Sequence, residues 1–406
     1  MTTSSAASAG PLQGVRVIEL GQLIAGPFCG KTLADFGAEV IKIEPPGKGD
    51  PLRKWRMLKN GNSVWWEVQS RNKQSVTLDL TQPEGQDILR ELVKEADVLI
   101  ENFRPGKMEE WGLGYEALKA INPRLVMARI SGYGQDGPYC NRPGFGVIAE
   151  SMGGLRYLTA EPGRVPVRVG VSIGDTLAAL HGVIGILMAL YHRDKGDKKA
   201  GGEGQVVDIA LYESVFNCME SLLPEYSAFN AVREAAGSAL PGIVPSNAYP
   251  CRDGWILIGG NGDGIFKRLM NAIGRNDYAA SQDMASNDGR VKHVADIDGA
   301  ITAWTKTHDK ADALKILDEH DVPSGAIYSI ADIAADAQYR AREMILNITT
   351  RDGYTVDVPG IVPRLSATPG GIRNTAPRLG EDTEAVLQRA GLKAETIADL
   401  RAKGVI

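Results

Sequence analysis

The residue best suited to chemistry in this sequence is Asp175, which stands between two apolar runs. Gly174 and Asp175 close the run that starts at Val169, and a predicted helix extends from Thr176 to about His192. Backbone N–H groups and the helix dipole favour the ionised form of a carboxylate at such a position. An ionised carboxylate can act as a nucleophile. Asp is also a preferred N-cap residue, however, and the local sequence alone favours capping.

A second polar cluster follows a predicted buried strand at 97–101. The segment from Glu101 to Lys107 supplies an amide, an aromatic ring and two cations at a strand end, where ligands bind in doubly wound sheets. A polar turn before Pro105 explains the same segment equally well. Six cations predict a basic rim that suits a ligand with several phosphates: Lys42, Lys48, Arg53, Lys73, Arg104 and Arg142.

Other kinds of site find little support. The turn at 21–30 lacks the Gly-x-Gly-x-x-Gly spacing of a dinucleotide fingerprint, although Glu44 stands where the ribose-binding acid would be. The segment Gly259–Gly264 is interpreted as a strand-to-helix turn, and His181 as a core residue of its helix. No metal site is predicted, because the cysteines match no ligand spacing: Cys29, Cys140, Cys218 and Cys251.

The elements that must position these residues alternate between strand and helix. Apolar runs predict strands at 15–20, 38–44, 75–80, 97–101, 125–130 and 205–210, with helices at 27–36 and from Pro83 between them. Repeated strand–helix–strand units of this length predict a parallel sheet with helices on both faces.

Length and composition set the frame. A chain of 406 residues exceeds the usual size of one core, so two domains are expected. The net charge of −5 argues against nucleic acid as a partner. No apolar run approaches the ~18 residues of a membrane span, and residues 1–10 read as a disordered tail without signal-peptide character. The residues at 193–204 read as a solvated charged loop. A cytoplasmic location is expected.

Taken together, the motifs resemble the class III CoA-transferases (the CaiB/BaiF family, which includes formyl-CoA transferase). The matching segments occur in family order along nearly the whole chain: 11–17, Ala25-Gly26-Pro27, 37–44, Asn72-Lys73, 101–106, 131–138, Gly174-Asp175 and Leu379-Gly380. Each motif is weak alone, whereas the ordered set is specific. The Ile243-Val244-Pro245 run and the approach to Asp175 from Arg168 resemble the succinyl-CoA:dicarboxylate branch of this family.

The resemblance implies an α/β fold with a Rossmann-like, doubly wound parallel sheet. The large domain would comprise 11–225, with a C-terminal segment, 331–406, returning to it, and a small α+β domain would span 226–330. Two chains of this family interlock, so a homodimer is expected.

The resemblance also implies a site. Asp175 would be the nucleophile that forms aspartyl anhydride and aspartyl-CoA thioester intermediates. The CoA site would be lined by Ile24, Ala25, Lys73, Leu78, Asn102, Phe103, Arg104 and Arg142. Acyl-CoA and a carboxylic acid would be substrates, with no tightly bound cofactor. Arg168 could pair with the distal carboxylate of a dicarboxylic acid.

The chain departs from the formyl-CoA enzyme at several positions. Pro45 replaces an arginine, Ile24 replaces a glutamine, and the small-domain loop lacks four consecutive glycines, which does not support formyl or oxalate specificity. Two alternatives remain open. An α-methylacyl-CoA racemase needs a histidine where this chain has Phe145, because a phenyl ring cannot take a proton. A non-catalytic acyl-CoA-binding protein would use Asp175 only to cap its helix.

Overall fold

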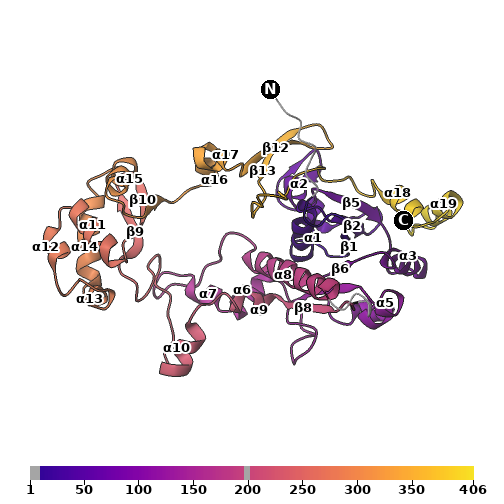
Figure 1. Ribbon diagram of the computed structural model, residues 1–406, viewed down its shortest axis with the longest axis horizontal. Coiled ribbons are helices and arrows are strands. Elements are labelled where there is room, and N and C mark those ends of the chain that lie inside the picture. Colours follow the sequence, from indigo (N-terminus) through magenta and orange to yellow (C-terminus); the bar gives the residue numbers. More distant parts are fainter. Residues whose placement is uncertain (1–9, 196–201) are drawn as a thin grey trace. The chain divides into compact units, whose positions relative to one another are not determined.

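The computed structural model describes residues 10–195 and 202–406. The chain forms two compact units, coloured by sequence in Figure 1. Unit 1 comprises Met1–Leu155, Val169–Asn230 and Arg340–Ile406, and unit 2 comprises Arg156–Arg168 and Ala231–Tyr339. Residues 1–9 of the expected tail and residues 196–201 of the expected charged loop lie outside the described residues.

Unit 1 is built on a six-stranded sheet in which every neighbouring pair is parallel. The strands are β1 (Arg16–Glu19), β2 (Glu39–Glu44), β5 (Lys73–Thr77), β6 (Val98–Glu101), β7 (Val126–Ser131) and β8 (Val206–Ala210), in the spatial order β5-β2-β1-β6-β7-β8. This is the doubly wound order, whose direction reverses between β1 and β6. The predicted α/β class with a parallel sheet is confirmed.

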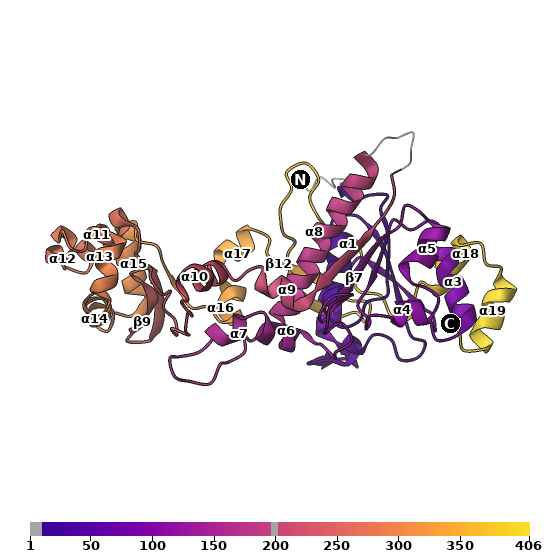
Figure 2. The same ribbon diagram turned by 90° about the horizontal axis from the view of Figure 1, so that it is seen from below.

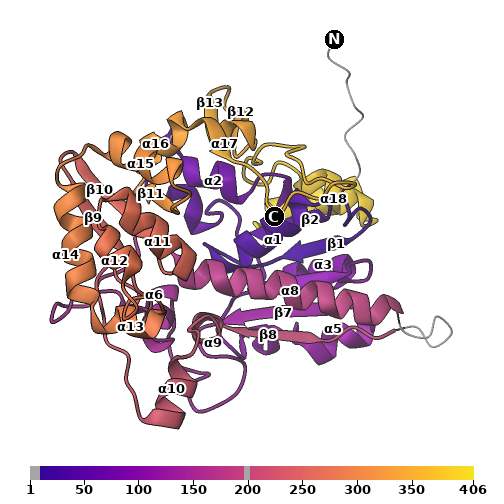
Figure 3. The ribbon, with the colours of Figure 1, turned by 60° about the vertical axis from the view of Figure 1, so that its left-hand side comes forward.

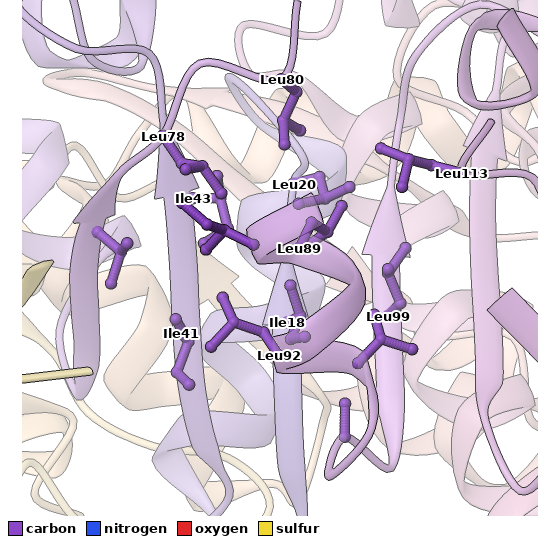
Figure 4. Packing of buried hydrophobic residues seen from close by; sticks show 14 of the residues in the cluster. Ile18, Leu20, Ile41, Ile43, Leu78, Leu80, Leu89, Leu92, Leu99 and Leu113 are labelled. Carbon is purple, nitrogen blue, oxygen red and sulfur yellow. The ribbon is translucent and has the colours of Figure 1, made fainter. Parts of the chain in front are cut away.

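Alternate strand residues face opposite sides of the sheet, as the pleat requires. Ile18, Ile41 and Leu99 belong to one apolar core, and Val17 and Val40 belong to the other. The first core is covered by α3 (Pro83–Val93), α5 (Tyr115–Ile121), α18 (Thr383–Arg389) and α19 (Ala394–Ala402), and the second by α1 (Ala25–Asp35) and α8 (Ile173–Lys195). Figure 2 shows the sheet between these two helical layers, and Figure 4 shows the first core around α3.

Two helices begin earlier than the sequence predicted. Helix α1 starts at Ala25 rather than Pro27, because proline is tolerated in a first turn whose N–H groups lack helical partners. Helix α8 starts at Ile173, after Ser172, whose carbonyl accepts a hydrogen bond from the Thr176 N–H at 3.2 Å. Asp175 is therefore the third residue of the helix, and its interpretation as the N-cap is wrong.

The remaining elements of unit 1 connect the sheet strands or follow unit 2. They are η1 (Pro51–Lys54), β3 (Leu58–Lys59), β4 (Asn62–Ser63), α2 (Val64–Gln69), α4 (Lys107–Glu110), α6 (Gly146–Met152), α9 (Leu211–Phe216), α10 (Leu222–Phe229), β12 (Ile345–Thr349) and β13 (Thr355–Pro359). Helix α7 (Leu155–Leu158) joins the two units in sequence.

Unit 2 has its own core around an antiparallel sheet of β9 (Ser246–Cys251), β10 (Gly254–Gly259) and β11 (Ser324–Ala326). Its helices are α11 (Asp263–Ala272), α12 (Asn276–Ala280), α13 (Asn287–Lys292), α14 (Val294–Thr305), α15 (Lys310–Glu319) and α16 (Ile330–Ala335), followed by α17 (Ala337–Ala341) (Figure 3). The Gly259–Gly264 segment links β10 to α11, so the predicted strand-to-helix turn is confirmed.

Helix α8 corrects one expectation drawn from composition. Among the described residues it is the one helix long and apolar enough to cross a membrane by those two criteria. Ala178, Ile186 and Leu190 are nevertheless buried in the core that α8 shares with the sheet. Its apolar length is thus partly explained by packing within unit 1.

Candidate active site

A pocket of about 320 Å³ lies where the strand order reverses. The segments that leave β1 and β6 form one side, and those that leave β7 and β8 contribute further residues. In an open α/β sheet this carboxyl edge is where ligands bind. The pocket is lined by Gln22, Leu23, Ile24, Ala25, Asn102, Phe103, Arg104, Pro105, Ile130, Ser131, Gly132, Cys140, Arg142, Pro143, Gly144, Phe145, Asp175 and Leu211.

The structure thus gathers seven of the nine predicted site residues: Ile24, Ala25, Asn102, Phe103, Arg104, Arg142 and Asp175. Asp175 is half-buried and stands in the first turn of a helix 23 residues long, where the dipole stabilises negative charge. Arg104 and Arg142 are exposed, and the Arg142 guanidinium lies 3.7 Å from the centre of the Tyr139 ring.

Asn102 holds the neighbouring loop in place. Its side-chain Oδ1 accepts a hydrogen bond from the Gln22 N–H at 2.8 Å, and its Nδ2 donates to the Gln22 carbonyl at 2.9 Å. The loop also passes close to α1, because a Cβ added to Gly21 would lie 2.9 Å from the Gly26 Cα. These contacts hold the backbone of the loop that leads to Ile24 and Ala25.

A buried ionic network lies beneath that loop. Lys42 Nζ lies 3.0 Å from Glu19 and 2.8 Å from Asp50, and it donates to the Gly21 carbonyl at 2.7 Å. The Leu23 N–H donates to Asp50, which supports a left-handed backbone (φ 64°) that a leucine rarely adopts. Burial lowers the pKa of Lys42, but the Asp50 and Glu19 carboxylates outweigh burial and raise it above its ordinary value.

Lys73 belongs to this network and not to the pocket. Its side chain is fully buried, its Nζ lies 2.7 Å from Glu19 Oε2, and it donates to the Pro27 carbonyl at 2.7 Å. Burial, opposed by Glu19, lowers the pKa of Lys73 to about 8. The structure therefore does not bring the Lys73 ammonium to the pocket surface.

The predicted basic rim is wrong for three of its six cations, for the same reason. Lys42, Lys73 and Arg53 are buried, and the Arg53 guanidinium is engaged by Glu44 through two hydrogen bonds of 2.8 Å. A buried cation of this kind is neutralised by its carboxylate and is not available to a phosphate. Arg104 and Arg142 remain at the pocket, and Lys48 lines the adjoining one.

The adjoining pocket, of about 420 Å³, contains Leu78. It shares the lining residues Gln22 and Phe103 with the first pocket, so the two are neighbours. The Phe103 and Trp111 rings meet edge to face with their centres 5.3 Å apart. The other lining residues are Leu20, Ile43, Glu44, Pro45, Pro46, Lys48, Asp79, Leu80, Thr81 and Gly404.

Glu101 is a buried residue directly before Asn102 of the pocket, and the sequence did not indicate its partners. Its Oε2 accepts a hydrogen bond from the Phe103 N–H at 2.7 Å, and its Oε1 lies 2.8 Å from Arg129 Nε. Burial raises the pKa of Glu101 to about 6, although Arg129 opposes the shift. Glu101 at the end of β6, paired with Arg129 within β7, thereby orients the segment that carries Phe103 and Arg104.

The chemistry available here centres on a carboxylate. The pocket lining contains no histidine within the described chain, and Phe145, which is 66% exposed, contributes a phenyl ring. His181 is occupied elsewhere, because its ring nitrogens contact the Leu177 carbonyl at 2.8 Å and Asn217 Oδ1 at 3.3 Å. The described residues contain no cluster able to hold a metal ion. A carboxylate in a pocket that exposed arginines also line suits acyl transfer from an anionic substrate.

Comparison with known proteins identifies the family to which the chain belongs. The family model for CoA-transferase family III matches residues 12–383. The chain is 48% identical to the succinyl-CoA–D-citramalate CoA-transferase of Chloroflexus aurantiacus and 42% identical to the beta subunit of its succinyl-CoA–L-malate CoA-transferase, with 98% of each chain covered in both cases. A CaiB/BaiF family protein from Brucella suis has a TM-score of 0.82 at 35% identity, over 94% of this chain and 100% of that one. The protein belongs to CoA-transferase family III, as the sequence resemblance indicated.

Proposed function

We propose that the protein transfers CoA from succinyl-CoA to a dicarboxylic acid through covalent intermediates on Asp175. The Asp175 carboxylate attacks the thioester carbonyl, which forms a mixed anhydride and releases CoA thiolate. The thiolate then attacks the aspartyl carbonyl, which gives an aspartyl-CoA thioester and frees succinate. The acceptor carboxylate attacks this thioester and releases the thiolate again. The thiolate finally attacks the acceptor's acyl carbon and regenerates Asp175.

One observation carries this proposal: in a CoA-transferase family III chain, the Asp175 carboxylate lines the pocket at the sheet's reversal point. Its place in the first turn of α8 favours the ionised, nucleophilic form. An activated acyl intermediate is readily hydrolysed, so a half-buried position also limits the access of water.

The two neighbouring pockets support a placement for CoA. In this placement the thioester end enters the pocket of Asp175, beside Ile24 and Ala25. The adenine occupies the adjoining pocket against Leu78 and Phe103, because flat apolar walls suit an aromatic base. Arg104 and Arg142 contact the phosphates, since guanidinium groups pair with phosphate oxygens in a fixed geometry.

The substrate assignment draws on the relatives, two of which are named for succinyl-CoA and for a hydroxy dicarboxylic acid. It fits the likeness of 243–245 and of the Arg168 segment to the same branch. To test it, transfer of CoA from succinyl-CoA to malate, citramalate and acetate is measured for the wild type and Asp175→Ala. The proposal predicts transfer to a dicarboxylate, little to acetate, and none by the variant. Equal transfer to acetate would remove the dicarboxylate assignment.

An interlocked homodimer is proposed as the working form. Leu180, Ile184, Leu187, Met188 and Tyr191 are 39–68% exposed in the single chain, at the spacing of one helical face of α8. An apolar stripe of this kind is typical of a covered surface. The proposal predicts a dimer in light scattering that Met188→Glu weakens, whereas a wild-type monomer would contradict it. A cytoplasmic location is proposed with it.

A further inference from the structure

Gly146, the first residue of α6, lies directly against the Asp175 carboxylate. A Cβ added to Gly146 would stand 2.0 Å from Oδ2, 2.6 Å from Cγ and 3.1 Å from Oδ1 of Asp175. Real Cβ atoms do not approach other heavy atoms to within 3.0 Å. The carboxylate therefore occupies the space that any side chain at position 146 would fill.

A second glycine permits the same close approach from α8. A Cβ added to Gly174 would lie 3.0 Å from the Gly146 carbonyl oxygen and 3.3 Å from Glu150 Cγ. The first turns of α6 and α8 thus meet with glycine on both sides. This contact sets the backbone of Asp175 against Gly146.

The Asp175 carboxylate is the group that lies closest to a Cβ added at Gly146. All three of the nearest atoms belong to the end of one side chain, whereas a Cβ at Gly85 would meet the Asp79 carbonyl oxygen at 2.0 Å. The φ of Gly146 lies outside the left-handed region, so alanine can adopt its backbone conformation. Alanine is also a better helix former than glycine. Gly146→Ala is therefore expected to move the carboxylate and to leave the fold intact.

We infer that Gly146 is a positioning residue for the reaction, because its lack of a side chain leaves the space that the Asp175 carboxylate occupies when it attacks the thioester. This inference rests on the proposed role of Asp175 as the nucleophile. A displacement of about 1 Å at a reacting group can cost about 100-fold in rate. Gly146→Ala should therefore lower kcat by about 100-fold. It should leave the dissociation constant for CoA nearly unchanged, since Arg104 and Phe103 are not disturbed.

The test compares Gly146→Ala, Asp175→Ala, the double variant and Gly299→Ala. Gly299 is an exposed residue within α14 of unit 2 with no atom within 4 Å of an added Cβ, so its variant controls for the substitution itself. For each protein, kcat, CoA affinity by calorimetry and the free energy of unfolding are measured. The expected pattern is a loss of kcat in Gly146→Ala at unchanged CoA affinity, with Gly299→Ala like the wild type.

The outcomes separate the inference from the proposed function. Wild-type kcat in Gly146→Ala, with no activity in Asp175→Ala, would overturn the role of Gly146 alone. Full activity in Asp175→Ala would overturn the proposed nucleophile as well. If Gly146→Ala is destabilised, the double variant decides, because removing the carboxylate removes the clash. A double variant that is as stable as Asp175→Ala supports the inference. A double variant that is less stable than Asp175→Ala contradicts it.

Discussion

Asn102 and Gln22 are joined by two hydrogen bonds, from the Gln22 N–H to Asn102 Oδ1 at 2.8 Å and from Asn102 Nδ2 to the Gln22 carbonyl at 2.9 Å. They connect the loops that leave β1 and β6, the two strands between which the sheet order reverses. The Asn102 side chain is thus engaged with protein backbone on both of its polar atoms. These bonds hold the part of the pocket wall against which CoA is proposed to lie.

Asn102→Ala is expected to weaken CoA binding by loosening this wall and to destabilise the fold. Two hydrogen bonds of about 1 kcal/mol each are lost, so the free energy of unfolding should fall by about 1–3 kcal/mol. KM for acyl-CoA should rise more than kcat falls. Asn102→Asp retains the acceptor but loses the donor, so its stability and its KM should lie between those of the wild type and Asn102→Ala. Chemical denaturation and steady-state kinetics measure both effects, and an unchanged KM would show that the pairing does not govern the site.

Arg104 and Lys73 were predicted as equivalent CoA ligands, and the structure separates them. Arg104→Ala removes an exposed cation from the pocket, so CoA affinity should fall about tenfold, or ~1.4 kcal/mol, with stability changed by no more than about 0.5 kcal/mol. Lys73→Met removes one partner of a buried ion pair and should destabilise the fold by about 3–5 kcal/mol. Calorimetry with CoA and denaturant unfolding distinguish the two variants. The reverse pattern would place Lys73 at the ligand and contradict the structure.

Glu67 in α2 is expected to make the free energy of unfolding depend on pH. Burial, together with the nearby Asp352 carboxylate, raises the pKa of Glu67 from 4.5 to about 7. The folded state therefore binds this proton more tightly than the unfolded state, so the Glu67 contribution to stability decreases as pH rises from about 4.5 to 7. Glu67→Gln, which cannot ionise, should remove that decrease. Its stability relative to the wild type should therefore be higher at pH 8 than at pH 5. Unfolding free energies for both proteins across this range provide the check, and parallel pH profiles would exclude Glu67 as the titrating group.

The sequence predicted those features that depend on local pattern. Buried strands, turns and the Glu101–Lys107 segment follow from apolar runs and from the residues that end them. The proposed role of Asp175 as the nucleophile needed the family resemblance, because an aspartate near a helix start is more often structural. Its exact place in the helix was missed, since the helix begins at Ile173, two residues before Asp175.

What the sequence could not provide is the partner of each charge. Lys42, Arg53 and Lys73 look like phosphate ligands in the sequence. The sheet brings Glu19 beside Lys42 and Lys73, and the segment after β2 brings Asp50 to Lys42 and Arg53 to Glu44. Gly146 carried no signal either, because its importance lies in a contact with a residue of another helix. Such contacts between distant segments are set by tertiary packing and not by local propensity.

In the proposed reaction, Asp175 carries the acyl group and then CoA. The most direct test of this role incubates the wild type and Asp175→Ala with succinyl-CoA, quenches with hydroxylamine or borohydride, and locates modified residues by peptide mass spectrometry. Hydroxylamine converts an aspartyl thioester or anhydride to the hydroxamate, and borohydride reduces it to the alcohol. We expect one of these modifications at Asp175 in the wild type and neither in the variant. An unmodified Asp175 in a protein that transfers CoA, or transfer by Asp175→Ala, would contradict it.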